Sequence, residues 1–259
     1  MAAMEYLATE VIEVARPADG YALIRFRGAA PIAARPGQFA MIRGAWGAHP
    51  VLPRAFSLVE AGDAGAVLVR DVGDATHRLV GMRAGDALSV LAPLGRGFSE
   101  LDPGRTAVLV AGGVGVAPLV FAAERLAAGG RRPIVLYGAR TARDLPLAER
   151  LAAAGDLRIA TEDGAAGERG LVTALLAPLL GDGRNAHVFS CGPERMLEAV
   201  ARLCVAAGAP CEIALESPMA CGMGTCKGCA VLAASGDYKY VCTDGPAFDA
   251  AEIYGGGAR

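Results

Sequence analysis

The sequence has few aromatic residues and almost no net charge, and each shortage excludes a class of partner. Aromatic residues make up 5% of the 259 positions, and 25 Lys and Arg face 27 Asp and Glu, for a net charge of −2. A protein that binds single-stranded nucleic acid needs aromatic platforms for the bases, and one that binds duplexes or anionic membranes needs a basic surface. We therefore expect neither nucleic acid nor a membrane as a partner.

The chain also lacks a signal-peptide pattern and a long apolar helix. Its beginning, MAAMEYLATEVIEVARPADG, has acidic residues where a signal peptide would have a basic end and an apolar run. The longest uncharged stretch, residues 106–123, is near the length of a membrane span. Glycines and a proline interrupt its middle, which favours a strand, a glycine turn and a helix instead. These features predict a cytoplasmic protein.

What the sequence does contain is enough apolar material for more than one folded core. Hydrophobic residues make up 53% of the chain and charged residues 20%, as in folded proteins, and 259 residues favour at least two domains. Residues 1–102 carry six apolar or alternating segments separated by Gly, Pro or Asp, which predicts a small antiparallel β-barrel. The segments are 6–16, 21–27, 38–44, 55–61, 66–72 and 87–93.

From residue 103 the pattern changes to alternating strands and helices. Buried strands are predicted at 106–112, 133–139, 157–162, 186–192 and 211–216, the last of the sheet. Helices are predicted at 117–130, 145–155, 170–180 and 193–208, the third interrupted by Pro178. This alternation is typical of a parallel sheet with helices on both faces, a Rossmann-like α/β domain. We assign 1–102 to the barrel, 103–215 to the α/β domain and 216–259 to a small C-terminal subdomain.

Four cysteines of the C-terminal subdomain follow the spacing C-x4-C-x2-C-x12-C. They are Cys221, Cys226, Cys229 and Cys242. In a reducing compartment, an odd total of seven cysteines with this clustering favours a metal site over disulfides. Zinc sites usually present two C-x2-C pairs, whereas C-x4-C-x2-C with a distant fourth cysteine matches a plant-type [2Fe–2S] loop. The spacing predicts a [2Fe–2S] cluster, with zinc or plain structural thiols as the alternatives.

The other cysteines and the histidines carry weaker signals. Cys204 falls on an amphipathic helix and Cys211 opens a buried strand, so both are expected in the core. His49, His77 and His187 are scattered among unrelated segments and are expected to be structural. We therefore expect no catalytic general acid or base.

A glycine turn, VAGGVGVAP at 110–118, stands between a buried strand and a helix. Gly112, Gly113 and Gly115 would let a phosphate approach the backbone, where the helix N-terminus presents unpaired N–H groups. The pattern is Gly-Gly-x-Gly-x-x-Pro, ending at Pro118, and differs from G-x-G-x-x-G. It predicts a dinucleotide site, and a turn that is rich in glycine only for packing is the alternative.

The barrel carries a possible flavin motif. RAFSLVE at 54–60 places Arg54 and Ser57 around the start of a strand, where a guanidinium and a hydroxyl can hold a flavin edge and its phosphate. More often such a pair lies on the protein surface and binds no ligand. VRDVGDAT at 69–76 and PLGRGF at 93–98 are further glycine-bearing turns predicted at the barrel ends.

Together these features resemble the ferredoxin-NADP reductase superfamily. The resemblance depends on the barrel motif R-x-x-S, the turn GGxGxxP, SCGPERML at 190–197 and the cysteine loop. More narrowly, ESPMACGMGTCKGC at 216–229 and YKYVCTDGPAFDAAEI at 238–253 are similar to the electron-transfer subunits of class 1B dihydroorotate dehydrogenases. The resemblance spans residues 5 to about 254.

The resemblance implies three cofactors and assigns residues to each. FAD would lie in the barrel, at its junction with the α/β domain, against Arg54, Ala55, Phe56, Ser57, Leu68, Val69, Arg70, Ala75 and Thr76. NAD would bind at Gly112, Gly113, Gly115, Pro118, Cys191, Gly192 and Pro193. The [2Fe–2S] cluster would be held by Cys221, Cys226, Cys229 and Cys242. Ala55 stands where the family usually has proline, and Ala75 where it usually has glycine.

The implied function is electron transfer between a partner's FMN and NAD+ by way of the cluster and FAD. Flavin can exchange electrons singly and in pairs, so it joins a one-electron cluster to a two-electron nicotinamide. The chain contains no second barrel of about 250 residues that could oxidise a pyrimidine. The resemblance therefore implies an FMN-containing dihydroorotate dehydrogenase catalytic subunit as partner, in a heterotetramer.

Three questions stay open on the sequence. The flavin and iron–sulfur subunits of bifurcating transhydrogenases, sulfide dehydrogenases and some hydrogenases have a similar organisation with other partners. A zinc-stabilised binding module without redox activity is an alternative of a different class. Arg140, after the second α/β strand, could meet the 2′-phosphate of NADP or be a solvated loop residue, although the resemblance implies NAD.

Overall fold

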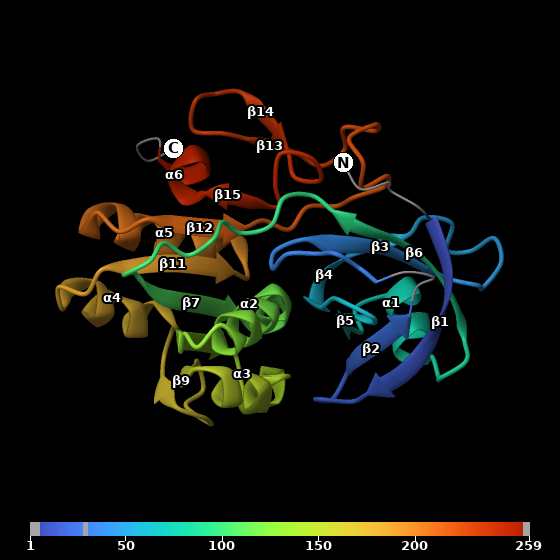
Figure 1. Ribbon diagram of the computed structural model, residues 1–259, viewed down its shortest axis with the longest axis horizontal. Coiled ribbons are helices and arrows are strands. Elements are labelled where there is room, and N and C mark those ends of the chain that lie inside the picture. Colours follow the sequence, from blue (N-terminus) through green and yellow to red (C-terminus); the bar gives the residue numbers. More distant parts are fainter. Residues whose placement is uncertain (1–5, 28–30, 256–259) are drawn as a thin grey trace.

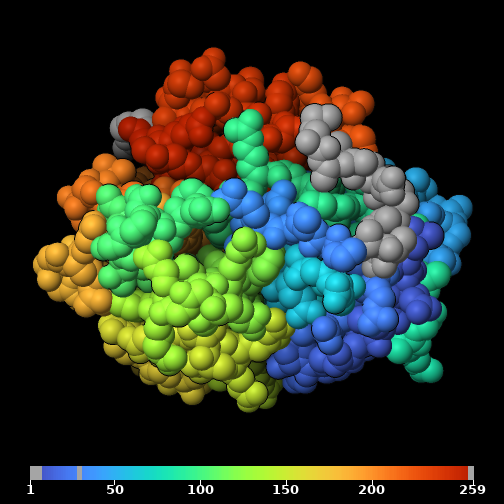
Figure 2. All heavy atoms as spheres, viewed as in Figure 1, coloured from blue at the N-terminus to red at the C-terminus, as the bar shows by residue number. Residues whose placement is uncertain are grey.

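The computed structural model describes residues 6–27 and 31–255, which form a barrel, an α/β domain and a C-terminal segment (Figure 1). The ends of the predicted domain ranges, residues 1–5 and 256–259, lie outside the described residues, as do residues 28–30. Figure 2 shows the C-terminal segment, in orange and red, lying along one edge of both other parts. All of the site residues predicted from the sequence fall within the described ranges.

Six strands close into an antiparallel barrel in the order β1-β2-β5-β4-β3-β6. They are β1 (Tyr6–Ala15), β2 (Tyr21–Arg27), β3 (Phe39–Gly44), β4 (Arg54–Glu60), β5 (Gly65–Arg70) and β6 (Ala87–Leu94). Each coincides with a predicted segment, because alternating apolar side chains such as Ile24, Val67 and Val90 fill one core. Pairing of β1 with β6 completes the barrel and leaves no exposed strand edge.

A short helix in the barrel, α1 (Asp74–Val80), begins within the segment predicted as a glycine-bearing turn at 69–76. The Thr76 hydroxyl accepts hydrogen bonds from the N–H groups of Val72 and Gly73, both at 2.9 Å, and so caps the first turn. The turn prediction is wrong for the last three residues of that segment, which are helical. Seven residues are too few to show a helical repeat in the sequence.

The α/β domain is built on a seven-stranded sheet in the order β10-β9-β8-β7-β11-β12-β15. Its strands are β7 (Thr106–Gly112), β8 (Ile134–Ala139), β9 (Asp156–Thr161), β10 (Glu168–Arg169), β11 (Ala186–Cys191), β12 (Cys211–Ala214) and β15 (Ala247–Asp249). Helices α2 (Val116–Ala128) and α3 (Ala148–Ala154) cover one face, and α4 (Thr173–Gly181) and α5 (Glu194–Ala207) cover the other. The strand order reverses between β7 and β11, and ligands bind parallel sheets at such a point.

Helix α4 runs through Pro178, which the sequence indicated as an interruption. The helix begins at Thr173, so Pro178 lies beyond its first turn and costs one backbone hydrogen bond. The helix packs against the sheet through its buried side chains Leu175, Leu176 and Leu179, and this packing keeps the helix intact. Within residues 6–27 and 31–255, none of the helices is both long and apolar enough to cross a bilayer.

The C-terminal segment joins both other parts. It contains the hairpin β13 (Ala230–Leu232) and β14 (Tyr238–Tyr240), then β15 and α6 (Ala250–Tyr254). Strand β15 pairs antiparallel with β12, so β12 is not the last strand of the sheet as predicted. On the barrel side, the Arg96 N–H donates to the Gly245 carbonyl at 2.5 Å. The predicted domain boundaries stay predictions, and the contacts across the last one are extensive.

Candidate functional site

A cavity of about 530 Å³ lies where the three parts of the chain meet. Strand β4 lines it with four consecutive residues, and β5 and α1 add others. Of the nine predicted flavin contacts, these seven line the cavity: Arg54, Ala55, Phe56, Ser57, Leu68, Arg70 and Thr76. Val69 and Ala75 are buried in the barrel instead, so their side chains do not reach it. Sequence motifs from three separate segments thus converge on one cavity.

The chemistry of this cavity fits a flavin nucleotide. Phe39, Phe56 and Leu68 give it apolar walls, which suit a flat ring. The Arg54 guanidinium donates to the Leu52 carbonyl at 2.7 Å and forms no ion pair within the described part of the chain. A guanidinium without a carboxylate partner is suited to a phosphate group. The Ser57 hydroxyl, on the same strand, is a further hydrogen-bonding group at the wall.

Arg70 connects the flavin cavity to a second cavity in the α/β domain, because it lines both. Its guanidinium lies 3.5 Å from the Asp144 carboxylate, which belongs to the loop after β8. The same guanidinium lies over the Tyr21 ring, 5.6 Å from its centroid. Because burial raises the pKa of Tyr21, its phenol group stays neutral. Arg70 therefore fixes the barrel against the α/β domain at the junction of the two cavities.

The sequence motifs missed one wall of the flavin cavity, which is formed by residues 215–219 after β12. The chain leaves the sheet at Ala214, two residues earlier than predicted, and Glu216, Ser217 and Met219 then face the cavity. Burial raises the pKa of Glu216. Its side chain is open to the cavity on one side and surrounded by protein atoms on the others. The sequence signal for this wall was ESPM at 216–219, which precedes the first ligand cysteine.

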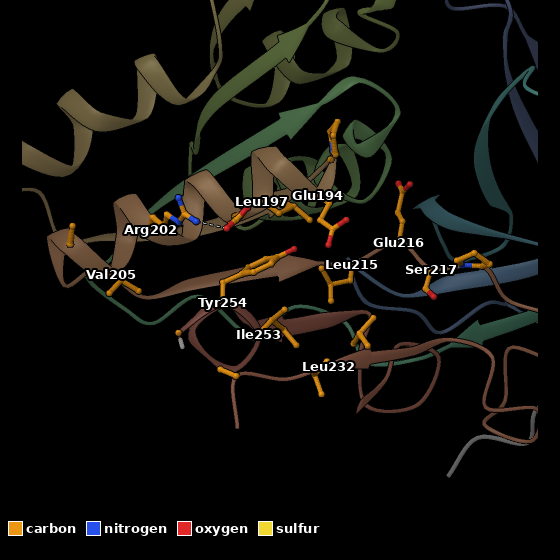
Figure 3. A pocket seen from close by; sticks show the side chains of 18 residues that line it. Glu194, Leu197, Arg202, Val205, Leu215, Glu216, Ser217, Leu232, Ile253 and Tyr254 are labelled. Carbon is orange, nitrogen blue, oxygen red and sulfur yellow. Dashed lines mark hydrogen bonds and ion pairs between the residues drawn. The ribbon is translucent and has the colours of Figure 1, made fainter. Parts of the chain in front are cut away.

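The segment 215–218 also borders a groove of about 830 Å³ between α5 and the C-terminal segment (Figure 3). Glu194 of α5 and Tyr254 of α6 lie on opposite sides of it. Burial, together with Glu194 and Glu198, raises the pKa of Tyr254 to about 12. The groove reaches Gly192 and Pro193 of the predicted C-G-P turn, and Pro193 also lines the second cavity, described next.

The second cavity, of about 600 Å³, lies along the carboxyl ends of the parallel strands. Gly112 ends β7, Gly113 follows it, and Pro193 precedes α5; all three line the cavity. Gly113 has φ of +53°, and a Cβ added there would meet nothing within 4 Å. Glycine is therefore needed at this position for the left-handed backbone and not for lack of room. Its position before α2 lets backbone N–H groups face a ligand phosphate. These are three of the seven predicted dinucleotide residues.

The other predicted dinucleotide residues form the support of this cavity. A Cβ on Gly115 would lie 2.5 Å from the Cys191 carbonyl oxygen, and one on Gly192 would lie 3.0 Å from Gly112 Cα. The turns after β7 and β11 therefore pack backbone against backbone. Pro118 is buried in α2 and Cys191 in β11, where burial raises the pKa of the Cys191 thiol and Glu216 adds to the effect. For Gly115, packing explains the glycine, as the alternative for the turn at 110–118 had it, and packing explains Gly192 as well.

The four predicted ligand cysteines lie around one tightly wound loop. Gly222, Gly224 and Lys227 have φ values of +73°, +85° and +57°, and this left-handed backbone turns N–H groups toward sulfur. The Gly224 N–H donates to Cys242 Sγ at 3.1 Å, and the Cys226 N–H to Cys221 Sγ at 3.4 Å. Burial acts to raise the pKa of Cys221. Hydrogen bonds to its sulfur, led by the one from the Cys226 N–H, outweigh burial and lower that pKa to about 7.

The thiols form two pairs, Cys221 with Cys226 and Cys229 with Cys242. Cys229 Sγ lies 3.2 Å from Cys242 Sγ, and the Cys226 side chain hydrogen-bonds to Cys221. Among the described residues, no three His, Cys, Asp or Glu side chains converge as the ligands of one metal ion would. Two pairs are what a binuclear cluster requires, since its four thiolates divide between two irons. The arrangement thus fits [2Fe–2S] better than it fits a single zinc ion.

The histidines lie apart from these sites. His187 is buried, stacks on Phe189 with centroids 4.3 Å apart, and has Nε2 3.2 Å from Glu212 Oε1. His49 and His77 are exposed and pair with Asp74 and Asp71. None of the three lines the flavin cavity or the strand-end cavity.

The cluster loop is seated on the barrel through Gly222. A Cβ there would lie 2.6 Å from Met41 Cγ and 3.1 Å from Leu94 Cδ1, besides the strain of its positive φ. We expect Gly222→Ala to lower the iron and sulfide content per chain, because the loop would have to move off β3 at a cost of about 1–3 kcal/mol. Gly236→Ala is the matched control, because its φ of +92° gives similar strain but nothing lies within 4 Å. Equal iron content in the two variants would contradict this contact's role.

The fold and the paired cavities define the class: an NAD-linked oxidoreductase of the ferredoxin-NADP reductase-like fold with an appended iron–sulfur domain. Residues 216–254 match the iron-sulfur cluster binding domain of dihydroorotate dehydrogenase B, and residues 109–202 match the oxidoreductase NAD-binding domain. A chain of the NADH-dependent reduced ferredoxin-NADP oxidoreductase structure, solved for its flavin-based electron bifurcation, superposes with a TM-score of 0.84 at 27% identity, covering 98% of this chain and 91% of that one.

Curated relatives narrow the class to a family. The dihydroorotate dehydrogenase B (NAD(+)) electron transfer subunit of Caldanaerobacter subterraneus subsp. tengcongensis is 36% identical over 222 residues, 84% of this chain and 86% of that one. The subunit of the same name from Clostridium acetobutylicum is 32% identical over 252 residues, 96% and 97% of the two chains. The chain belongs to the family of dihydroorotate dehydrogenase B electron transfer subunits. Its cofactors are those predicted: FAD, a [2Fe–2S] cluster and NAD.

Proposed function

We propose that the chain passes electrons between the FMN of a dihydroorotate dehydrogenase catalytic subunit and NAD+, through a [2Fe–2S] cluster and FAD, in pyrimidine biosynthesis. FAD, when bound, supplies exchange of electrons both singly and as hydride, which the cluster and the nicotinamide each require. The family of the chain and its two matched domains support this function. The residues of the chain bind, orient and insulate these groups.

In this proposal each part of the chain holds one group. Residues 1–102 hold FAD, with Arg54 at its phosphate, Ser57 at the flavin edge and Arg70 at the junction with NAD. Residues 103–215 hold NAD, with Gly113 and the α2 N-terminus at its pyrophosphate. Residues 216–259 hold the cluster on Cys221, Cys226, Cys229 and Cys242. Residues 215–219 form the wall of the flavin cavity that continues into the cluster loop.

One observation carries this function: the cluster loop and the flavin cavity share a packed apolar cluster. Cys229 and Cys242 are buried in the same hydrophobic cluster as Phe39 and Met41 of β3. Phe39 also lines the flavin cavity. A connected set of packed apolar side chains therefore joins the buried thiol pair to the wall of the cavity proposed for FAD. A packed path of this kind suits electron transfer.

The exposed edge of the cluster loop is the proposed contact with the catalytic subunit. Cys226 is exposed, whereas Cys229 and Cys242 are buried. Met223, between the first two ligand cysteines, is 40% exposed, and an apolar side chain at that position is suited to burial by a partner. Electrons would enter at this edge and leave at the strand-end cavity. We propose a heterotetramer of two electron-transfer and two catalytic subunits.

The function is tested by co-expressing the chain with an FMN-containing dihydroorotate dehydrogenase subunit of the family. We expect one complex on size exclusion, with flavin absorption near ~450 nm and a broad iron–sulfur shoulder. We expect that complex, but not the catalytic subunit alone, to reduce NAD+ with dihydroorotate. A chain that neither associates nor supports this reaction would contradict the proposal. A colourless chain containing zinc would overturn the redox assignment altogether.

A second candidate is a flavin and iron–sulfur subunit with another partner. The similarity to a bifurcating oxidoreductase chain, at a TM-score of 0.84, favours this alternative, although identity to it is 27% against 36% for the dihydroorotate dehydrogenase relative. Affinity purification of the tagged chain from its own cells separates the two. Recovery of a ferredoxin-linked or hydrogenase subunit, in place of an FMN-containing barrel subunit, would favour the alternative.

A further inference from the structure

A separate cavity, of about 270 Å³, lies at the seam between the barrel and the α/β domain, and we call it the seam cavity. Figure 2 shows the hollow between the linker that follows β6, in green, and helix α2, in lighter green. Of the described residues that line it, none also lines the flavin cavity, the strand-end cavity or the groove beside α5. The cofactors proposed above therefore leave the seam cavity without a role.

The floor of the seam cavity is apolar and aromatic. Phe98 of the linker, Leu109 of β7 and Phe189 of β11 line it, and all three are buried. The rings of Phe98 and Phe189 meet edge to face with their centroids 5.4 Å apart. On its other contact, the Phe189 ring stacks on His187. These contacts hold the rings in place, and a floor of this kind suits a flat ring.

Three arginines, Arg35, Arg125 and Arg131, line the same cavity. Within the part of the chain that the structure describes, their guanidiniums form no ion pair and donate to backbone carbonyls instead. Arg35 donates to the Phe98 carbonyl at 3.1 Å, and Arg125 donates to the Ala34 carbonyl at 3.4 Å. A carbonyl orients a guanidinium without neutralising it, and each of these two bonds uses a single N–H. Most of the donors therefore stay available to an anion.

The carboxylates near the seam cavity do not neutralise this charge. Glu124 of α2 lies 2.7 Å from Arg150, and Asp102 of the linker lies 3.3 Å from Arg105, so both are paired elsewhere. Among the described residues, Glu100 is the one acid that lines the cavity. The C-terminus of α2 adds roughly half a negative charge. Three arginines outweigh both, although the whole chain has a net charge of −2, and the cavity therefore attracts anions.

Hydrogen bonds fix the walls of the seam cavity without a ligand. Arg131, just after α2, donates to the linker carbonyls of Leu101 at 3.0 Å and Arg105 at 2.8 Å. The Phe98 N–H donates to the Pro36 carbonyl at 2.8 Å, which ties the linker to the loop before β3. A cavity with walls already in place loses little conformational entropy when a ligand binds.

We propose that the seam cavity binds a small ring-bearing anion, a flat ring that carries one carboxylate or phosphate group. The ring would lie on Phe98 and Phe189, and the acid group would accept hydrogen bonds from Arg35 and Arg125. Pockets for drug-sized ligands have about 300–1,000 Å³, so a cavity of about 270 Å³ suits a single ring and is too small for a dinucleotide. Because the barrel, the linker and α2 all contribute walls, the bound anion would hold the two domains together outside both cofactor cavities.

The proposal is tested by calorimetric titration of the purified, FAD-loaded holoprotein with saturating NAD+ present, so that the glycine turn is occupied. Benzoate and phenyl phosphate each combine a ring with an acid group, whereas inorganic phosphate lacks the ring and benzamide lacks the charge. We expect at least one of the two ring anions to bind about tenfold or more tightly than either inorganic phosphate or benzamide. The tighter of the two identifies the acid group as a carboxylate or a phosphate.

Variants place the bound anion in the seam cavity. Arg125→Gln should weaken the ring anion about tenfold, because it removes a charge from the wall. Arg132→Gln is the matched control and should leave the affinity unchanged, since Arg132 also donates to a backbone carbonyl, that of Gly155 at 2.8 Å, but does not line the cavity. Ala122→Leu, which adds bulk to the cavity from α2, should abolish binding while the flavin content is retained.

Four outcomes would overturn the proposal. Absence of binding by both ring anions would show that the cavity is not an anion site. Benzamide binding as tightly as benzoate would remove the arginines from recognition. Equal losses in Arg125→Gln and Arg132→Gln would reduce the effect to general attraction by a basic surface. Unchanged affinity in Ala122→Leu would place the anion elsewhere on the chain.

Discussion

Replacing Cys226 with serine is expected to abolish electron exchange with the catalytic subunit while NADH still reduces the flavin at nearly the normal rate. Cys226 is the exposed ligand of the proposed cluster, at the edge where the partner would bind. Serine keeps the size of the side chain but is a poor ligand for iron, because the thiolate is the form that binds metal. The flavin and strand-end cavities do not include Cys226.

The loss should exceed the 10–100-fold typical of altering an outer-shell group at a metal site. Stopped-flow bleaching of the flavin by NADH measures one half of the path, and NAD+ reduction by the complex with dihydroorotate measures the whole. Cys204→Ala is the control, because this thiol is buried in α5 away from the loop and should leave both rates and the iron content unchanged. A Cys226→Ser complex with full NAD-linked activity would remove the cluster from the path.

Much of the fold could be predicted because local patterns and tertiary packing agree. The six barrel strands follow from alternation, and five of the six parallel strands follow from buried runs such as TAVLVAG at 106–112. The elements that were missed are short and depend on distant contacts. Strand β15 has three residues, and it forms because the edge of β12 needs a partner. No pattern of three residues carries that information.

The site could be predicted only in part for a similar reason. Motifs name residues whose chemistry is recognisable, such as the four cysteines or Arg54. They do not name residues 215–219, which line the flavin cavity because the chain crosses from the sheet to the cluster loop there. Glu162, which lines the strand-end cavity with Arg140, was missed as well, because an exposed acid in a loop looks ordinary until the register pair Ala139↔Thr161 sets it beside Arg140.

Alanine at Gly115 is expected to disable the dinucleotide site. A Cβ there would meet the Cys191 carbonyl oxygen at 2.5 Å and the Gly192 nitrogen at 2.6 Å. These are backbone atoms at the end of a central strand, so no side chain can rotate away. The turns after β7 and β11 must separate, and overpacking of this kind costs about 1–3 kcal/mol. Since each 1.4 kcal/mol is tenfold in affinity, ADP-ribose should bind on the order of 10–100-fold more weakly.

The matched control shows whether the contact or the lost glycine is responsible. Gly181→Ala, at the end of α4, places its Cβ in open space and needs no unusual φ, so binding should be unchanged. The Gly115→Ala chain should keep its iron, because the cluster loop packs on β3, away from this turn. Normal ADP-ribose affinity in Gly115→Ala would mean that the two turns separate without consequence. The interlocked backbones would then be a packing device of the sheet, and the dinucleotide would have to be held by the side chains of the strand-end cavity.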